Sequence, residues 1–236
     1  MDICENIDFY CLNFHEERKE KMIKKGNHFK IPIVFYSGVL SSDTRITFVE
    51  NLGIRRTASI CYGHLDMLQH FIDNSTKEFA IVMEDDILIK DTFVEDIIKS
   101  IDVMKTENID ILMIGYLCHN PIHTYSNFPE IYTPYSTHKF RIMGYPNDSW
   151  GTQMYMISRK QCIYLLDKYT NGYLERSLEN LEMIPFSADW TITKEGKRAL
   201  LYPLRVIENG SMEYEDEWQD KCRKLCAEFT ERHGFI

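Results

Sequence analysis

Three consecutive carboxylates follow one of the most apolar stretches of the chain. Residues 79–83 are all apolar, which is typical of a strand covered on both faces, and Glu84, Asp85 and Asp86 come directly after them. Crowded carboxylates repel one another and lose hydration, so one of them must titrate at a higher pH or a cation must lie among them. Ligands of open α/β sheets bind beyond the carboxyl ends of the strands. The segment is therefore a candidate site for Mg²⁺ or Mn²⁺, which prefer oxygen ligands; the alternative is a solvated turn before a helix.

A fourth carboxylate, that of Asp189, stands in a run of apolar and small residues. Residues 184–188 precede it and Trp190 follows it. Apolar surroundings raise the pKa of a carboxyl group, which suits it to act as a general base. The alternative is an acid at a helix N-terminus that interacts with exposed N–H groups and the helix dipole. Both descriptions can hold at once.

Polar residues beside other predicted strand ends complete the candidates. Asn13 and Arg18 flank the end of the first strand, where an arginine can bind a diphosphate through two hydrogen bonds, or belong to a solvated helix face. Gly151 and Thr152 either let a ligand approach the backbone closely or form an ordinary turn before a strand. His64 lies on or near the apolar face of a predicted helix, so it is either a core histidine or a catalytic group.

The elements that must position these residues alternate between strands and helices. Apolar runs and helical periodicity predict strands at 6–13, 29–36, 79–83 and 110–115, with helices at 16–25, 59–73 and 92–105. This alternation predicts an α/β fold with a mostly parallel sheet and helices on both faces. Gly26 is expected to end the first helix, and Asp91 to cap the third.

The second half of the chain adds fewer regular elements. It is predicted to contain strands at 150–158 and 199–207, and helices at 159–169, 177–183 and 213–233. Residues 121–148 lack clear periodicity, and so long a loop in a compact domain is usually functional or mobile. No repeat, low-complexity tract or linker is found. We therefore predict a single domain over residues 1–236, with a C-terminal helical extension at about 211–236.

The composition excludes several classes of protein. The formal net charge of −9 argues against a protein that coats nucleic acid, but it permits an anionic substrate because a metal can reverse the local sign. No apolar run is long enough for a transmembrane helix, and the acidic N-terminus does not resemble a signal peptide. We expect a cytoplasmic protein, or one domain of a larger secretory-pathway protein. Seven cysteines without a CxxC pair indicate buried free thiols in a reducing compartment.

Taken together, five segments resemble glycosyltransferase family 25, which includes lipooligosaccharide and procollagen galactosyltransferases. Residues 6–13 with Arg18 are similar to its opening strand, and residues 81–86 to its "LEDD" segment. Residues 59–64 are similar to its "GC..SH" helix start, although Gly63 replaces the usual serine. Residues 151–158 and 185–190 resemble its later strand and its "P.D" segment. Each motif is weak alone, but five in the family's order are specific.

The resemblance implies a GT-A fold (Rossmann-like), a UDP-sugar donor, Mn²⁺ or Mg²⁺, and inversion at the anomeric carbon. The expected reaction moves galactose or glucose from UDP-galactose or UDP-glucose to a hydroxyl of a glycan or of a collagen-like hydroxylysine. Asp86 and Asp85 would hold the cation, Glu84 would support it or contact the sugar, and Asp189 would be the base. The donor would be bound by Asn13, Arg18, His64, Asp85, Gly151 and Thr152.

Two further expectations concern geometry. Strand alternation would place Glu84 and Asp86 on one side of the strand and Asp85 on the other. The loop at 116–148 would contribute to the acceptor side.

The segment after the last predicted strand departs from the family's pattern. It contains Glu208 and Asn209 where an acidic or glutamine-rich end is expected, so the remaining metal ligand stays open between these two. Two other functions compete with glycosyl transfer. A nucleotidyl- or phosphotransferase could use the same carboxylates, but the chain lacks a glycine-rich phosphate loop. An inactive homologue that serves as a binding or scaffold subunit would not need the intact acidic residues.

Overall fold

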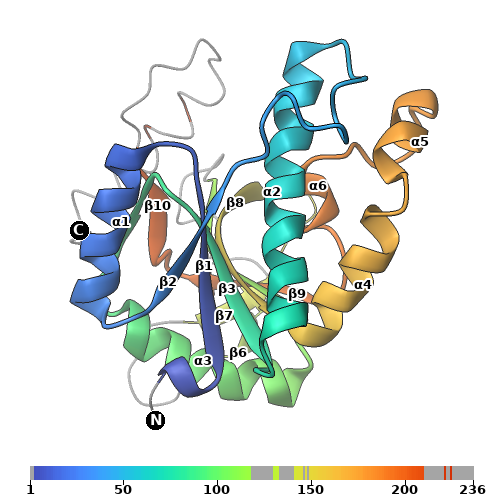
Figure 1. The fold of residues 1–236 in the computed structure, drawn as a ribbon. Helices are drawn as coiled ribbons and strands as arrows, with labels where there is room; N and C mark the ends of the chain where they lie inside the picture. The colour runs from blue at the N-terminus through green and yellow to red at the C-terminus, as the bar shows by residue number, and fades with distance from the viewer. Residues whose placement is uncertain are drawn as a thin grey trace.

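A mixed β-sheet forms the centre of the computed structural model, which describes residues 3–117, 130–132, 141–145, 147, 149–209, 221 and 224 (Figure 1). Its strands are β1 (Ile7–Asn13), β2 (Ile33–Ser37), β3 (Phe79–Glu84), β4 (Ile87–Ile89), β5 (Ile111–Leu117), β6 (Glu130–Tyr132), β7 (Arg141–Gly144), β8 (Trp150–Ser158), β9 (Arg198–Tyr202) and β10 (Val206–Glu208). The helices are α1 (Glu16–Phe29), α2 (Leu52–Asn74), α3 (Phe93–Glu107), α4 (Arg159–Tyr169), α5 (Tyr173–Glu179) and α6 (Ala188–Thr191), after a short 3-10 helix at Ile3–Glu5.

Most strands of the sheet point the same way. The order is β2-β1-β3-β8-β5-β9-β7-β6, and β10 pairs with both β4 and β5. Strands β1, β2 and β3 are mutually parallel, as are β5, β9 and β10, while β8 runs antiparallel between β3 and β5. The prediction of an α/β fold with a mostly parallel sheet is confirmed.

The direction of β8 decides which residues meet at the edge of the sheet. Because β8 is antiparallel to β3 and β5, its first residues lie where those strands end: Trp150 pairs with Leu117, and Met154 with Met83. Asn13 ends β1, Glu84 ends β3 and Glu208 ends β10 at the same edge. This carboxyl edge therefore gathers polar residues from four strands.

Helices cover both faces of the sheet, as the strand composition predicts. On one face Ala80 and Val82 of β3 pack in a core shared with α2 and α4. On the other, Ile81 and Met83 pack in a core shared with α1 and α3. Figure 1 shows α1 on one flank of the sheet, and α2 with α4 on the other. Burial of side chains on both faces explains why β3 is apolar without alternation.

The approach of α2 to β1 is close at Gly63. A Cβ at Gly63 would lie 2.7 Å from Cδ1 of the buried Leu12. The serine of the family pattern would therefore require the Leu12 side chain to shift. Gly63 is a packing position here.

Several predicted boundaries are wrong. Gly26 does not end α1, which continues to Phe29 because Met22, Gly26 and Phe29 form its buried face; the helix ends at Lys30 in the left-handed conformation (φ 56°). Thr92, not Asp91, precedes α3. Instead of one last strand at 199–207 there are two, β9 and β10, and the helix predicted at 177–183 lies at Tyr173–Glu179.

Some expectations fall outside the described residues. These are most of the loop at 116–148 and the C-terminal helix at 211–236, except for Lys221 and Lys224. Of the cysteines, Cys4, Cys11, Cys61 and Cys162 are described, and all four are free thiols; the last three are buried as expected, whereas Cys4 is partly exposed. None of the helices in the described ranges is long and apolar enough to cross a membrane.

A buried ion pair ties the segment before β10 to α3. Arg205 Nε lies 2.5 Å from Asp96 Oδ2, and both side chains are almost fully buried. Arg205 Nη1 also donates to the Pro203 carbonyl at 2.6 Å. Since β10 carries Glu208, this pair fixes one side of the carboxyl edge.

We expect Asp96→Ala to lower the free energy of unfolding by about 3–5 kcal/mol, because it leaves the Arg205 guanidinium buried without its carboxylate. Glu95→Ala is the control: its pair with Lys99 is exposed, so the loss should stay within about 1 kcal/mol. Urea unfolding followed by circular dichroism measures both. Equal losses for the two variants would contradict this role of the buried pair.

Candidate active site

Asp85 is the hub of the carboxyl edge. Its Oδ2 accepts hydrogen bonds from Asn13 Nδ2 at 2.8 Å and from the Phe14 backbone N–H at 3.0 Å. Its Oδ1 accepts from Arg18 Nη1 at 3.1 Å. The side chain is only 4% exposed. Both oxygens are thus engaged by β1 and α1, so Asp85 is best suited to hold Asn13 and Arg18 in place.

Among the acids at this edge, Asp86 has the pKa that is raised furthest. Arg18 Nη1 donates to its Oδ2 at 3.2 Å, while its buried Oδ1 has no hydrogen-bond partner among the described residues. Burial, and then the charges of Glu84 and Glu208, raise the pKa of Asp86 to about 7, against the lowering effect of Arg18. A cation beside Oδ1 would stabilise the ionised form of Asp86 and so lower its pKa.

Only the first of the three acids lies within the strand. Strand β3 ends at Glu84, and Asp85 and Asp86 form a bend, so the two-residue period of a strand no longer applies to them. Arg18 of α1 donates to both Asp85 and Asp86, whereas Glu84 accepts from Thr152 of β8. That Glu84 and Asp86 share a side, opposite Asp85, stays a prediction.

Glu84 is held by β8 and backed by a buried histidine. Thr152 Oγ1 donates to Glu84 Oε1 at 2.9 Å, and His64 Nε2 lies 3.8 Å from the same oxygen. His64 Nδ1 is 3.1 Å from the Tyr155 hydroxyl, and the ring has no exposed surface. The buried ring of His64 packs next to Glu84 and can help to hold it in place. Direct contact of His64 with a nucleotide stays a prediction.

Asp189 lies at the same edge, at the start of α6. The Gly151 N–H donates to Asp189 Oδ1 at 2.9 Å. Burial, followed by the charge of Glu84, raises the pKa of Asp189 to about 6, although the Gly151 hydrogen bond opposes the rise. Gly151 has φ 110°, and a Cβ there would lie 2.8 Å from the Leu117 backbone N, so glycine is needed at this position. The raised pKa agrees with the sequence argument.

The donor set for a divalent cation is small. No group of three or more His, Cys, Asp or Glu side chains in the described ranges is arranged to hold a metal ion. Asp86 Oδ1 is the available oxygen, and Glu208 is close enough to raise the pKa of Asp86. The Asn209 N–H donates to the Asp86 carbonyl at 2.6 Å, which fixes the end of β10 beside the acids. One or two carboxylates suffice for Mg²⁺ when substrate phosphates supply further ligands.

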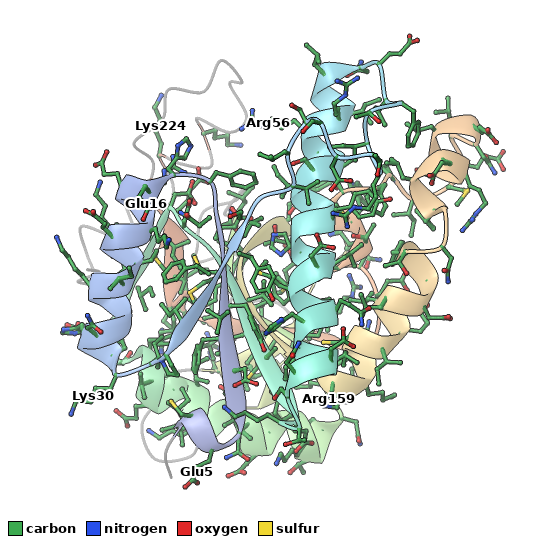
Figure 2. All side chains as sticks on the ribbon, in the orientation of Figure 1. Glu5, Glu16, Lys30, Arg56, Arg159 and Lys224 are labelled. Carbon is green, nitrogen blue, oxygen red and sulfur yellow. The ribbon has the colours of Figure 1, made fainter. Side chains whose placement is uncertain are left out.

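A cavity of about 730 Å³ adjoins the acids on the side of α1. Its wall includes Asp85, Asp86 and Asn209, together with both acidic and basic side chains of α1 between Glu16 and His28. Figure 2 shows Glu16 at the end of α1 nearest the carboxyl edge, and Lys30 at the other end. From the sequence this charged helix could either bind a diphosphate through Arg18 or be a solvated face, and no sequence feature indicated the cavity. The sequence argument also missed Tyr155, because a tyrosine in an apolar strand is usually a core residue.

Comparisons with known proteins give structural likenesses only. No family model and no curated protein matches the chain. One similar solved structure is a glycosyltransferase involved in the glycosylation of the major capsid of PBCV-1, with 10% identity, a TM-score of 0.42, and coverage of 94% of this chain and 99% of that one. Another is A197 from STIV, with 13% identity, a TM-score of 0.38, and coverage of 85% and 83%. Both TM-scores are below 0.5, so neither likeness carries an assignment of function.

We expect Asp86→Asn to stabilise the protein at pH 8 in metal-free buffer, by on the order of 2–4 kcal/mol. The pKa of Asp86 rises from 3.8 to about 7 on folding, so the folded state loses stability as the pH rises from about 4 to 7 and keeps this loss above 7. Asparagine removes this cost. The advantage should shrink as the pH falls through 7 and vanish near pH 4.

Urea unfolding between pH 4 and pH 8 measures this difference. Asp102→Asn, at an exposed position of α3, is the matched control and should show no such pH dependence. A stability gain for Asp86→Asn that does not change with pH would show that crowding of charge is not its cause.

Proposed function

We propose that the chain is a metal-dependent, inverting glycosyltransferase related to family 25. It would move galactose or glucose from UDP-galactose or UDP-glucose to a hydroxyl of a glycan or of a collagen-like hydroxylysine. The single observation that carries the proposal is the joint placement of two kinds of carboxylate at one sheet edge. Asp86 has a raised pKa and an oxygen without a partner among the described residues, and Asp189, also with a raised pKa, lies near Glu84.

The first part of the site would bind the diphosphate of the donor. Arg18, held in place by Asp85, presents a guanidinium beside Asp86, and guanidinium groups bind phosphate oxygens well. Asp86 would hold Mn²⁺ or Mg²⁺, with Glu208 as the second protein carboxylate. The bound cation would supply Lewis-acid stabilisation of the charge that forms on departing UDP. Asn13 lies next to Arg18 and would contact the nucleotide.

The second part of the site would position and activate the acceptor. Asp189 would accept the proton of the attacking hydroxyl, for which a pKa near 6 is suitable at neutral pH. Glu84, fixed by Thr152 and backed by His64, would accept hydrogen bonds from hydroxyls of the transferred sugar. Gly151 would keep Asp189 in position through its N–H. Separate acids for the leaving group and the acceptor suit a single displacement, which inverts the anomeric carbon.

The first experiment is an assay of UDP release from a panel of UDP-sugars. We expect release from UDP-galactose or UDP-glucose with Mn²⁺, and none with EDTA. Asp86→Ala should abolish it, while the control Asp102→Asn should keep it. Release of UMP or pyrophosphate would favour a nucleotidyl- or phosphotransferase instead. UDP binding without turnover of any sugar, with or without acceptors, would favour a binding subunit.

The role of Asp189 can be tested separately. Asp189→Asn should lower kcat of transfer by about 10²–10⁴-fold, because the base is lost, yet leave UDP binding intact. In the wild type, kcat/KM should fall about tenfold per unit below pH 6, where Asp189 becomes protonated. Calorimetry with UDP and a pH–rate profile measure these effects. An unchanged acid limb in the Asp189→Asn variant would exclude Asp189 as the base.

A further inference from the structure

One buried amide at the carboxyl edge is left without a hydrogen bond to its oxygen. Gln153 of β8 is only 5% exposed, and its Oε1 has no hydrogen-bond partner among the described residues. Buried oxygens are nearly always hydrogen-bonded, because the water that they lose on burial must be replaced by another donor. A buried amide oxygen that finds no donor in the protein is suited to accept one from a ligand.

Two glycines leave the room that the Gln153 side chain occupies. A Cβ at Gly151 would overlap Gln153 Oε1, and a Cβ at Gly115 of β5 would lie 3.3 Å from Gln153 Cβ. The pairing of β5 with β8 is irregular on both sides of Gly115. Irregularities such as β-bulges are common beside active sites, where they redirect a side chain. Here the irregular pairing accompanies a glutamine whose amide oxygen lies against the backbone of Gly151.

The neighbours of Gln153 connect it with both candidate acids of the acceptor side. Thr152, the preceding residue, donates to Glu84 at the end of β3. Gly151, against which the amide oxygen packs, donates to Asp189 through its N–H. The amide therefore lies at the part of the edge that joins Glu84 to Asp189.

We propose that Gln153 is a specificity-determining residue whose amide hydrogen-bonds to a hydroxyl of the transferred hexose, an inference that rests on the proposed transferase function. In a single displacement the anomeric carbon lies between the departing UDP oxygen and the attacking hydroxyl. The hexose would therefore lie between the cation at Asp86 and the base at Asp189. An amide offers both an acceptor and donors, and a sugar hydroxyl can both donate and accept. A neutral amide also binds a hydroxyl without adding charge to an edge that is already crowded with acids.

Assays of UDP release with Mn²⁺ test the proposal, with UDP-galactose, UDP-glucose and their monodeoxy analogues, one for each hydroxyl of the hexose. Gln153→Met removes the amide and nearly conserves the volume. For the preferred donor we expect kcat/KM to fall about tenfold or more, as a hydrogen bond in a desolvated site is lost. For the deoxy donor that lacks the contacted hydroxyl, wild type and variant should differ by less than about twofold.

Gln161→Met is the matched control. Gln161 of α4 is also buried, and its Nε2 has no partner among the described residues. It lies beside Asp110, which precedes β5 and is thus at the opposite end of that strand from the carboxyl edge. This variant should leave kcat/KM unchanged for every donor. Because Gln153 Oε1 gains no hydrogen bond in the described part of the chain, the urea midpoint of Gln153→Met should not fall below that of the wild type.

Two outcomes of these assays would overturn the inference. An equal loss of kcat/KM for all donors, together with a lower urea midpoint, would show that the amide supports the fold and reads no hydroxyl. Equal kcat/KM values of wild type and Gln153→Met for every donor would show that the amide does not contact the transferred hexose.

Calorimetric titration with the same donors separates this inference from the proposed function. If the wild type binds UDP-galactose or UDP-glucose without releasing UDP, the transferase proposal fails, and the comparison of Kd values between normal and deoxy donors decides the inference. If UDP is released and Gln153→Met discriminates among donors as the wild type does, the transferase proposal stands and only the inference fails. Wild-type protein that binds neither donor would contradict both.

Discussion

Crowding of negative charge at the end of β3 is the constraint on which the rest of this edge depends. Glu84, Asp85 and Asp86 are consecutive, and their partners stabilise them to different extents. Asp85 takes three hydrogen bonds from β1 and α1, Glu84 takes one from Thr152, and Asp86 shares Arg18 but keeps a raised pKa. The unequal distribution of partners makes one carboxylate a structural anchor and leaves another available to a cation. If all three carboxylates were equally hydrogen-bonded, none of them would remain available to a cation.

The position of β8 brings a second group of residues to this edge of the sheet. A strand that enters from this edge delivers its first residues, Gly151 and Thr152, beside the last residue of β3. Thr152 then binds Glu84, and Gly151 binds Asp189 from a distant part of the chain. A parallel strand in the same place would deliver its last residues there instead. The antiparallel insertion of β8 thus connects the acids of β3 with the candidate base.

The buried ionic groups of this protein differ in how far their partners offset their charge. Asp96 and Arg205 are almost fully buried but directly paired, so they act as a fixed connection between α3 and the segment before β10. Asp86 and Asp189 are less completely compensated, and the pKa of each is raised towards neutrality. Groups with shifted pKa values are suited to proton transfer and to binding cations. Burial acts on Lys25 in the opposite direction, because it lowers the pKa of the ammonium group.

The sequence alone determined the alternation of elements and the acidic segment. Apolar continuity in 79–83 predicted a strand buried on both faces, and the three following acids marked the edge where a ligand would bind, because adjacent carboxylates repel one another in any tertiary arrangement. The raised pKa of Asp189 also followed from its apolar neighbours. Only the tertiary structure decided that Asp86 joins Asp85 at Arg18, that the buried His64 lies near Glu84, and that α1 lines a cavity beside the acids. The physical reason is that local sequence fixes the period and burial of an element, whereas strand direction, bends and helix placement decide which side chains share one electrostatic environment.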